Sequence, residues 1–163
     1  AMGVYWAGVI RILSPSAWIE NADEIEKDFK KNGPMVHEYA HLVVDYKTRG
    51  NYPRWFTEGI AQFVEKEITG YQFASLGATE NWYSLSDLNS GYDTLPNQSL
   101  VYGQSLLMVE FLVDSYGFEK ILNLLDRLGE GKSMETAFNE ELGITLEEFE
   151  ESFPQWVLLK EMN

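Results

Sequence analysis

The pattern of apolar and polar positions divides the chain into one short β segment followed by a series of helices. Residues Val4 to Leu13 are rich in β-branched and aromatic side chains and predict a strand that is interrupted at Gly8. A lone strand cannot satisfy its own backbone. The segment therefore requires either a hairpin turn at Ala7-Gly8 or a partner strand from elsewhere in the chain.

Helical periodicity and capping residues account for most of the remaining sequence. They predict helices at about residues 18–31, 34–46, 53–65, 83–88, 97–116, 118–128, 133–143 and from 145 onward. Ser84 and Ser133 are expected helix caps, and Thr145 with Glu148 forms a capping box. Pro154 should kink or divide the last helix, because a proline inside a helix removes a hydrogen bond.

The predicted helix at 34–46 carries the chemistry, in the run His37-Glu38-Tyr39-Ala40-His41. Side chains at i and i+4 lie on the same face of a helix, so the two imidazoles can share one small cation. Glu38 then lies beside the metal, where it can take a proton from a bound water molecule. The chain contains no histidine besides these two. The plain alternative is a pair of surface histidines with a solvated glutamate.

A third protein ligand must then be Asp, Glu or Tyr, and the predicted helix at 53–65 offers Glu58. This residue falls among apolar positions, where a carboxylate is costly unless it is paired or binds a metal. Gly59 beside it leaves room for a facing helix or a substrate. The alternative is that Glu58 is an acid near the helix N-terminus that complements the helix dipole.

These residues resemble a known family. The motif His37-Glu38-x-x-His41, followed by Pro53-x-Trp55-x-x-Glu58-Gly59, resembles the gluzincin metallopeptidases, the group of thermolysin and the zinc aminopeptidases, and more closely the peptidase MA-like proteins. The C-terminal helical part, with Tyr102-Gly103-Gln104-Ser105, is similar as well. The resemblance implies that His37, His41 and Glu58 bind one Zn²⁺ ion and that Glu38 is the general base.

The resemblance raises three further questions. Gluzincins supply a Tyr or His to stabilise the oxyanion, and Tyr102 is the candidate here, ahead of Tyr39, Tyr83 and Tyr92 and against a plain packing role. The N-terminal strand is either the edge along which a peptide substrate lies or a core strand without substrate contact. Asp45, one turn beyond His41, either orients an imidazole or faces solvent.

Composition narrows the class of protein. The 163 residues suit a single domain, and a net charge of −14 argues against nucleic acid as a partner. The charge favours cationic peptides or serves solubility alone. The absence of cysteine excludes disulfides, and no run is long enough to span a membrane. Residues 1–3 resemble the remnant of an expression tag, and the family resemblance suggests an extracytoplasmic location.

Together these patterns predict a single zincin-like domain over residues 1–163, of the α+β class, predominantly helical with a small N-terminal β part. The expected function is zinc-dependent hydrolysis of peptide bonds in a peptide or protein substrate. The competing hypotheses are a zinc-binding or regulatory module without activity and a zinc hydrolase that acts on other amides.

Overall fold

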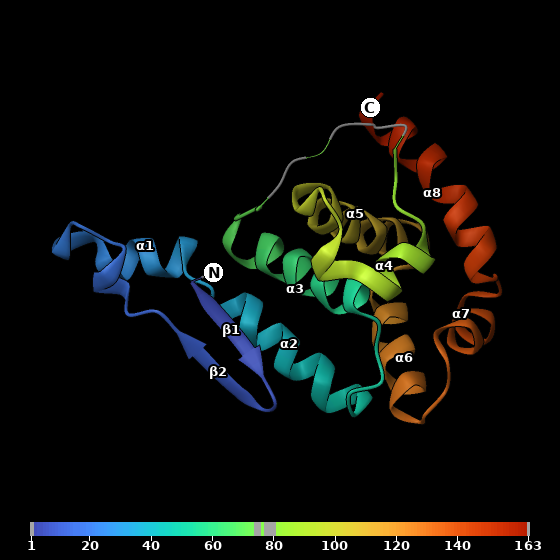
Figure 1. Cartoon of the computed structure of the whole chain (residues 1–163), viewed down its shortest axis with the longest axis horizontal. Helices are drawn as coiled ribbons and strands as arrows, with labels where there is room; N and C mark the ends of the chain where they lie inside the picture. The colour runs from blue at the N-terminus through green and yellow to red at the C-terminus, as the bar shows by residue number, and fades with distance from the viewer. Residues whose placement is uncertain (1, 74–75, 77–80, 163) are drawn as a thin grey trace.

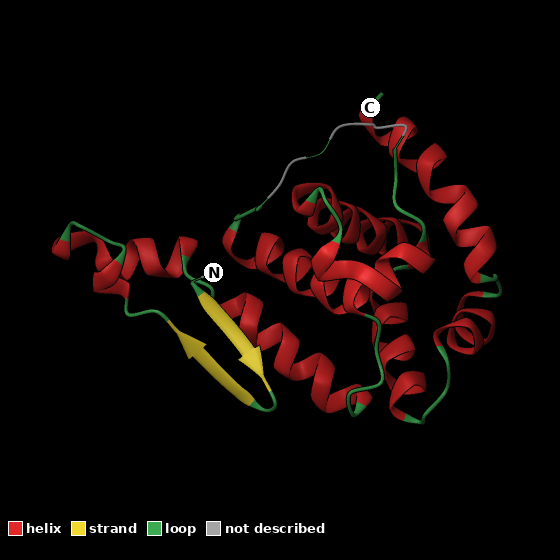
Figure 2. Ribbon diagram, viewed as in Figure 1, coloured by secondary structure: helices red, strands yellow, loops and turns green. Residues whose placement is uncertain are grey.

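The computed structural model describes residues 2–73, 76 and 81–162. Helices dominate it, and a two-stranded antiparallel sheet lies at the N-terminus (Figure 1, Figure 2), which confirms the predicted fold class. The strands are β1 (Gly3–Trp6) and β2 (Val9–Ile12). The α-helices are α1 (Ile25–Asn32), α2 (Met35–Thr48), α3 (Arg54–Thr69), α4 (Leu85–Gly91), α5 (Gln98–Tyr116), α6 (Phe118–Gly129), α7 (Met134–Leu142) and α8 (Leu146–Glu161).

The β segment forms a hairpin with a two-residue turn. Tyr5 lies opposite Ile10 and Trp6 opposite Val9. Ala7 and Gly8 both have positive φ angles, 49° and 81°, which is the geometry that suits a tight hairpin. The prediction of a local hairpin is therefore confirmed, and the alternative of a partner strand from elsewhere is wrong for the described residues.

Helix α3 is the centre of the helical part. It packs mainly against α2 on one side and α5 on the other, and the hairpin lies along α2 (Figure 1). Gly59 makes the close approach of α3 to α5 possible, because a methyl group there would clash with the main chain of Ser105 and with Val109. Trp55 and Phe56 of α3 are fully buried in the main hydrophobic core. This packing fixes the face of α3 that carries Glu58.

Most helix boundaries agree with the sequence pattern. Ser84 and Thr145 make the capping boxes at the starts of α4 and α8, and Asn97 caps α5. The prediction of one helix over residues 18–31 is wrong at its start, because short 3₁₀ turns precede α1 and the Asn21 side chain accepts a hydrogen bond from the Asp23 amide.

The prediction was that Pro154 kinks or divides the last helix, and the division is wrong. Helix α8 continues through Pro154 as one element. Phe149, Phe153 and Val157 are buried on both sides of it. This packing holds the helix against the core in spite of the missing backbone donor.

Candidate metal centre

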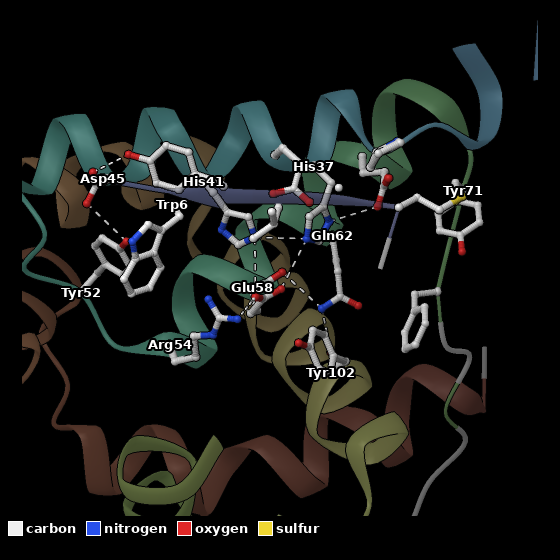
Figure 3. Close-up of a pocket in the computed structure, with 18 of the residues that line it drawn as sticks. Trp6, His37, His41, Asp45, Tyr52, Arg54, Glu58, Gln62, Tyr71 and Tyr102 are labelled. Atoms are coloured by element: carbon white, nitrogen blue, oxygen red, sulfur yellow. Dashed lines mark hydrogen bonds and ion pairs between the residues drawn. The ribbon is translucent and has the colours of Figure 1, made fainter. Parts of the chain in front are cut away.

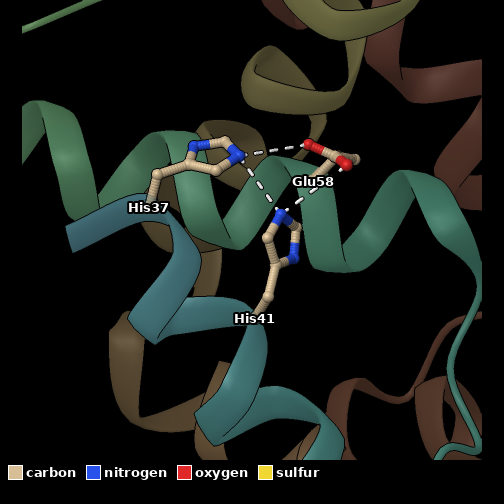
Figure 4. Close-up of side chains that lie close together, drawn as sticks. All are labelled: His37, His41 and Glu58. Carbon is tan, nitrogen blue, oxygen red and sulfur yellow. Dashed lines mark hydrogen bonds and ion pairs between the residues drawn. The ribbon is translucent and has the colours of Figure 1, made fainter. Parts of the chain in front are cut away.

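Helices α2 and α3 bring together the three predicted metal ligands. His37 and His41 lie one turn apart on α2, and Glu58 faces them from α3 (Figure 4). The Nε2 atoms of the histidines are 3.1 Å apart. Oxygen atoms of Glu58 lie 3.4 Å from Nε2 of His37 and 3.6 Å from Nε2 of His41. The ligand atoms all lie within 4.8 Å of one another, so the three side chains can hold one metal ion.

Each imidazole is fixed by a partner on its other nitrogen. Nδ1 of His41 is 2.8 Å from Oγ1 of Thr57, and Nδ1 of His37 is 3.2 Å from Oε2 of Glu65. Such partners orient histidine ligands and direct Nε2 at the metal. Sequence analysis missed both residues. Glu65 had a readable signal, because it lies two turns after Glu58 on the same face of α3.

The electrostatics of the cluster fit a bound cation. Burial alone would lower the pKa of His37, but Glu58 and Glu65 raise it to about 9. Burial would raise the pKa of Glu58, but the two histidines and Arg54 hold it well below its usual range. Oε2 of Glu58 is buried and has no hydrogen-bond partner among the described residues. When the imidazoles are neutral, lone pairs of the three side chains converge here, and a bound metal ion would satisfy them.

Glu38 lies beside these ligands at the cleft. Its side chain lines the cleft together with His37 and His41, and the residue is 6% exposed. Strand β1 packs closely on it, since a Cβ at Gly3 would come within 2.9 Å of Cγ of Glu38 and 2.8 Å of Pro34. The carboxylate is therefore held at the edge of the cleft, near the candidate ligands but outside their cluster.

Asp45 has a role that neither prediction anticipated. Its carboxylate accepts hydrogen bonds from the Tyr5 hydroxyl at 2.5 Å and from the Tyr52 hydroxyl at 3.3 Å. Burial and the charge of Asp45 raise the pKa of Tyr52 to about 12. The expectation that Asp45 orients an imidazole is wrong, and so is the expectation that it simply faces solvent. It ties the hairpin to α2.

Tyr102 lies near the cluster, on α5 (Figure 3). Burial and the charge of Glu58 raise its pKa. Its rivals are placed less well. Tyr39 is 58% exposed and does not line the cleft, and the hydroxyl of the buried Tyr92 pairs with Ser105. The Tyr83 hydroxyl accepts a hydrogen bond from the Asn97 amide, also outside the cleft.

The three candidate ligands, Glu38 and Tyr102 all line one cleft of about 720 Å³ (Figure 3). Residues 2–7, in and next to β1, form one side of it, and α2 and α3 supply the candidate ligands. Arg54 also lines the cleft, and its Nη2 lies 3.1 Å from Oε1 of Glu58. The arrangement combines three side chains that can hold a metal ion, a neighbouring carboxylate and room for a peptide-sized ligand.

Comparison with known proteins identifies the family. The sequence profile of the Peptidase MA superfamily matches residues 21–159, which include the whole candidate metal centre. The chain belongs to the Peptidase MA superfamily. As a member of this superfamily it has a peptidase-like scaffold, which agrees with the predicted relationship to the peptidase MA-like proteins.

The sequence of the chain is also similar to that of a curated protein. The chain is similar to "Uncharacterized protein YhcO" of Bacillus subtilis (strain 168), with 24% identity over 133 residues. The match covers 73% of the chain and 39% of that protein, so the chain spans well under half the length of this relative. No solved structure matches the chain significantly. No helix among the described residues is both long and apolar enough to cross a membrane.

Proposed function

We propose that this chain is a zinc-dependent peptidase in which His37, His41 and Glu58 hold one zinc ion. The proposal depends above all on the convergence of these three side chains, which come from two helices, at the side of an open cleft. The two imidazoles each have an outer partner, Thr57 or Glu65, as expected for histidine ligands. Two nitrogen atoms and one carboxylate oxygen form a donor set typical of catalytic zinc.

Each cleft residue has a distinct task in this proposal. A bound zinc ion would supply a lowered pKa for water and polarisation of the substrate carbonyl. Glu38 takes the proton of the attacking water and passes it to the leaving amine. The Tyr102 hydroxyl donates a hydrogen bond to the developing oxyanion. The raised pKa of Tyr102 keeps this hydroxyl protonated at neutral pH.

Strand β1 offers an edge along which an extended peptide can lie. The Leu13 amide donates to the Met2 carbonyl, which makes this pair a hydrogen-bonded pair of the ladder. By alternation, the backbone groups of Gly3 and Tyr5 point away from β2. Residues 2–7 line the cleft, whereas those of β2 do not. We therefore favour the edge-strand hypothesis over that of a core strand without substrate contact.

The experiment that tests the proposal compares zinc content and cleavage of a quenched peptide library. The wild-type protein should contain about one zinc per chain and lose activity on chelation. Glu38→Gln should keep its zinc but lose activity by about 10²- to 10⁴-fold, the usual contribution of a general base. Glu67→Gln is the matched control, because it makes the same charge change at an exposed position of α3. Equal activity of the two variants would refute the role of Glu38.

A zinc-binding or regulatory module without activity remains the second candidate. It is favoured by the small size of the described sheet, which has only two strands to position a substrate. The module hypothesis predicts stoichiometric zinc without chelator-sensitive cleavage of any peptide. A panel of non-peptide amides separates the remaining hypothesis, a zinc hydrolase with another substrate.

A further inference from the structure

One end of the cleft, beyond His37, presents acceptor groups and aromatic rings. Gln62, Glu65, Tyr71, Phe73 and Tyr102 line this part of the cleft. In Figure 3, Gln62 and Tyr71 lie on the side of Glu58 opposite to Arg54. Arg54 is the only Lys or Arg among the described residues that line the cleft. At the Gln62 end the described lining therefore supplies no Lys or Arg, and the charge of a protonated His37 is paired with Glu58 and Glu65.

The orientation of the Gln62 amide is fixed by its surroundings. Its Nε2 donates to the main-chain carbonyls of Glu58, at 3.2 Å, and Tyr102, at 2.9 Å. A flipped amide would place Oε1 against these two carbonyl oxygens, so Oε1 must point the other way. In Figure 3 it points away from Glu58, toward the side of the cleft where Tyr71 lies. Gln62 is 4% exposed, and Oε1 has no partner among the described residues.

Glu65 adds a negative charge next to this acceptor. Gln62 and Glu65 are three residues apart on α3 and therefore share a helix face. Oε2 of Glu65 is engaged with His37, and Oε1 has no partner among the described residues. The Glu65 side chain is 8% exposed, and the residue lines the same cleft as Gln62. A ligand here must donate hydrogen bonds and benefits from positive charge.

Aromatic rings complete the site. Phe73 and Tyr102 are in edge-to-face contact, with ring centroids 5.8 Å apart, and Tyr71 lines the same part of the cleft. Ring faces attract ammonium and guanidinium groups. A lysine ammonium has three donors and no acceptor, which matches the unpartnered oxygens of Gln62 and Glu65 and the neighbouring ring faces. The net charge of −14 adds a general attraction for such ligands.

We propose that Gln62, Glu65 and the rings of Tyr71, Phe73 and Tyr102 form a subsite that binds a protonated amine of the substrate. This inference rests on the proposed peptidase function for the identity of the ligand, which is a peptide. The amine belongs either to a lysine side chain or to the peptide N-terminus. If the amine is a lysine side chain, the subsite favours substrates with lysine near the cleaved bond. If the amine is the N-terminus, the subsite fixes how many residues from the N-terminus the peptide is cleaved.

The test uses hexapeptides in which each position in turn carries lysine, norleucine or glutamate. One set has blocked ends and a second set has a free N-terminus, so the two sources of the amine are separated. Binding is measured by calorimetry on zinc-loaded Glu38→Gln, so that it does not depend on turnover, and cleavage is measured on the wild-type protein. A failure of the proposed hydrolysis would then leave the binding preference intact, and a failure of the subsite would leave hydrolysis intact.

In the blocked set we expect lysine to bind about tenfold more tightly than norleucine at one position, as for a hydrogen bond to a charged group. If the amine is the peptide N-terminus, the same factor should separate the free from the blocked set. Gln62→Leu should reduce the ratio toward one without loss of zinc. Gln98→Leu is the matched control, because Gln98 also donates to two main-chain carbonyls, those of Tyr92 and Leu95, but does not line the cleft.

A second variant keeps the test decisive if Gln62→Leu does not fold. Phe73 is 58% exposed, so Phe73→Leu should fold normally while it removes one ring face. It should weaken lysine binding and leave norleucine binding unchanged. The proposal is overturned if neither lysine nor a free N-terminus improves binding at any position, or if Phe73→Leu and every folded Gln62 variant keep the full preference.

Discussion

The protonation of His37 makes a quantitative prediction about metal binding. In the metal-free protein Glu58 and Glu65 raise the pKa of His37 to about 9 against the opposing effect of burial, so the ring carries a proton at neutral pH. A metal ion must displace this proton. At pH 7, two units below the pKa, the displacement costs about 2.7 kcal/mol, or about a hundredfold in apparent affinity.

The sign of the effect follows from the raised pKa. Zinc affinity should rise with pH and level off near pH 9, where His37 is already neutral. Between pH 6 and pH 8 the contribution of His37 is about a hundredfold, whereas an ordinary histidine with a pKa of about 6.5 would contribute only about fourfold. Competition with a chromophoric chelator of known pH dependence measures this difference directly.

A variant of Glu65 separates the proposed cause from other pH effects. Glu65→Gln removes one of the two carboxylates that raise the pKa of His37, so zinc affinity should rise less steeply with pH. The affinity at pH 9 should also fall, by about 10- to 100-fold, because the orienting carboxylate is lost. Glu67→Gln, at an exposed position of the same helix, should change neither quantity. The reasoning would be refuted if zinc affinity of the wild-type protein rose only fourfold between pH 6 and pH 8, or if Glu65→Gln showed the same dependence of zinc affinity on pH as the wild-type protein.

Three further predictions concern stability and the hairpin. Gly59→Ala should destabilise the zinc-loaded protein by about 1–3 kcal/mol in urea unfolding, because the added methyl group overpacks the contact between α3 and α5; no loss would show that this contact is looser than described. Tyr5→Phe should leave zinc content unchanged but raise KM more than it lowers kcat, because the hydrogen bond to Asp45 that ties β1 to α2 is lost, and a change in kcat alone would contradict this role. The metal-free protein should lose stability as pH rises from about 6.5 through 9, because His37 gives up its proton over this range, whereas the zinc-loaded protein should not. Thermal unfolding of both forms at pH 6 and pH 9 tests this difference.

Local signals in the sequence were sufficient for much of the fold. The spacing of His37 and His41 required only that one segment be helical, and α2 is helical there. The Ala7-Gly8 turn and the Thr145 capping box are likewise short-range features that depend on neighbouring residues. Such features could be read without knowledge of the tertiary structure.

Contacts between distant segments could not be read in this way. Asp45 pairs with Tyr5, forty residues earlier, because the hairpin lies along α2, and no local pattern signals that contact. Thr57 and Glu65 partner the two histidines only because α3 lies beside α2 at one particular rotation. The polarity pattern around Trp18 predicts a helix, whereas in the structure Asn21 caps a separate 3₁₀ turn at Ala22–Glu24.

The Gln62 amide illustrates the same limit within the cleft. Its position in α3 among apolar residues suggests an ordinary buried glutamine. Only the two carbonyls that accept from its Nε2, one of them on α5, show that its oxygen must point the other way. The chemistry of the cleft beyond the motif thus depends on how α3 and α5 pack together.

Anomalous diffraction at the zinc edge, from crystals of the zinc-loaded protein, tests the central claim most directly. We predict a single strong peak about 2.0–2.2 Å from Nε2 of His37, Nε2 of His41 and one carboxylate oxygen of Glu58. A molecule without such a peak after loading, or with zinc bound elsewhere while Glu58 faces bulk solvent, would contradict the proposed metal centre and the peptidase function with it.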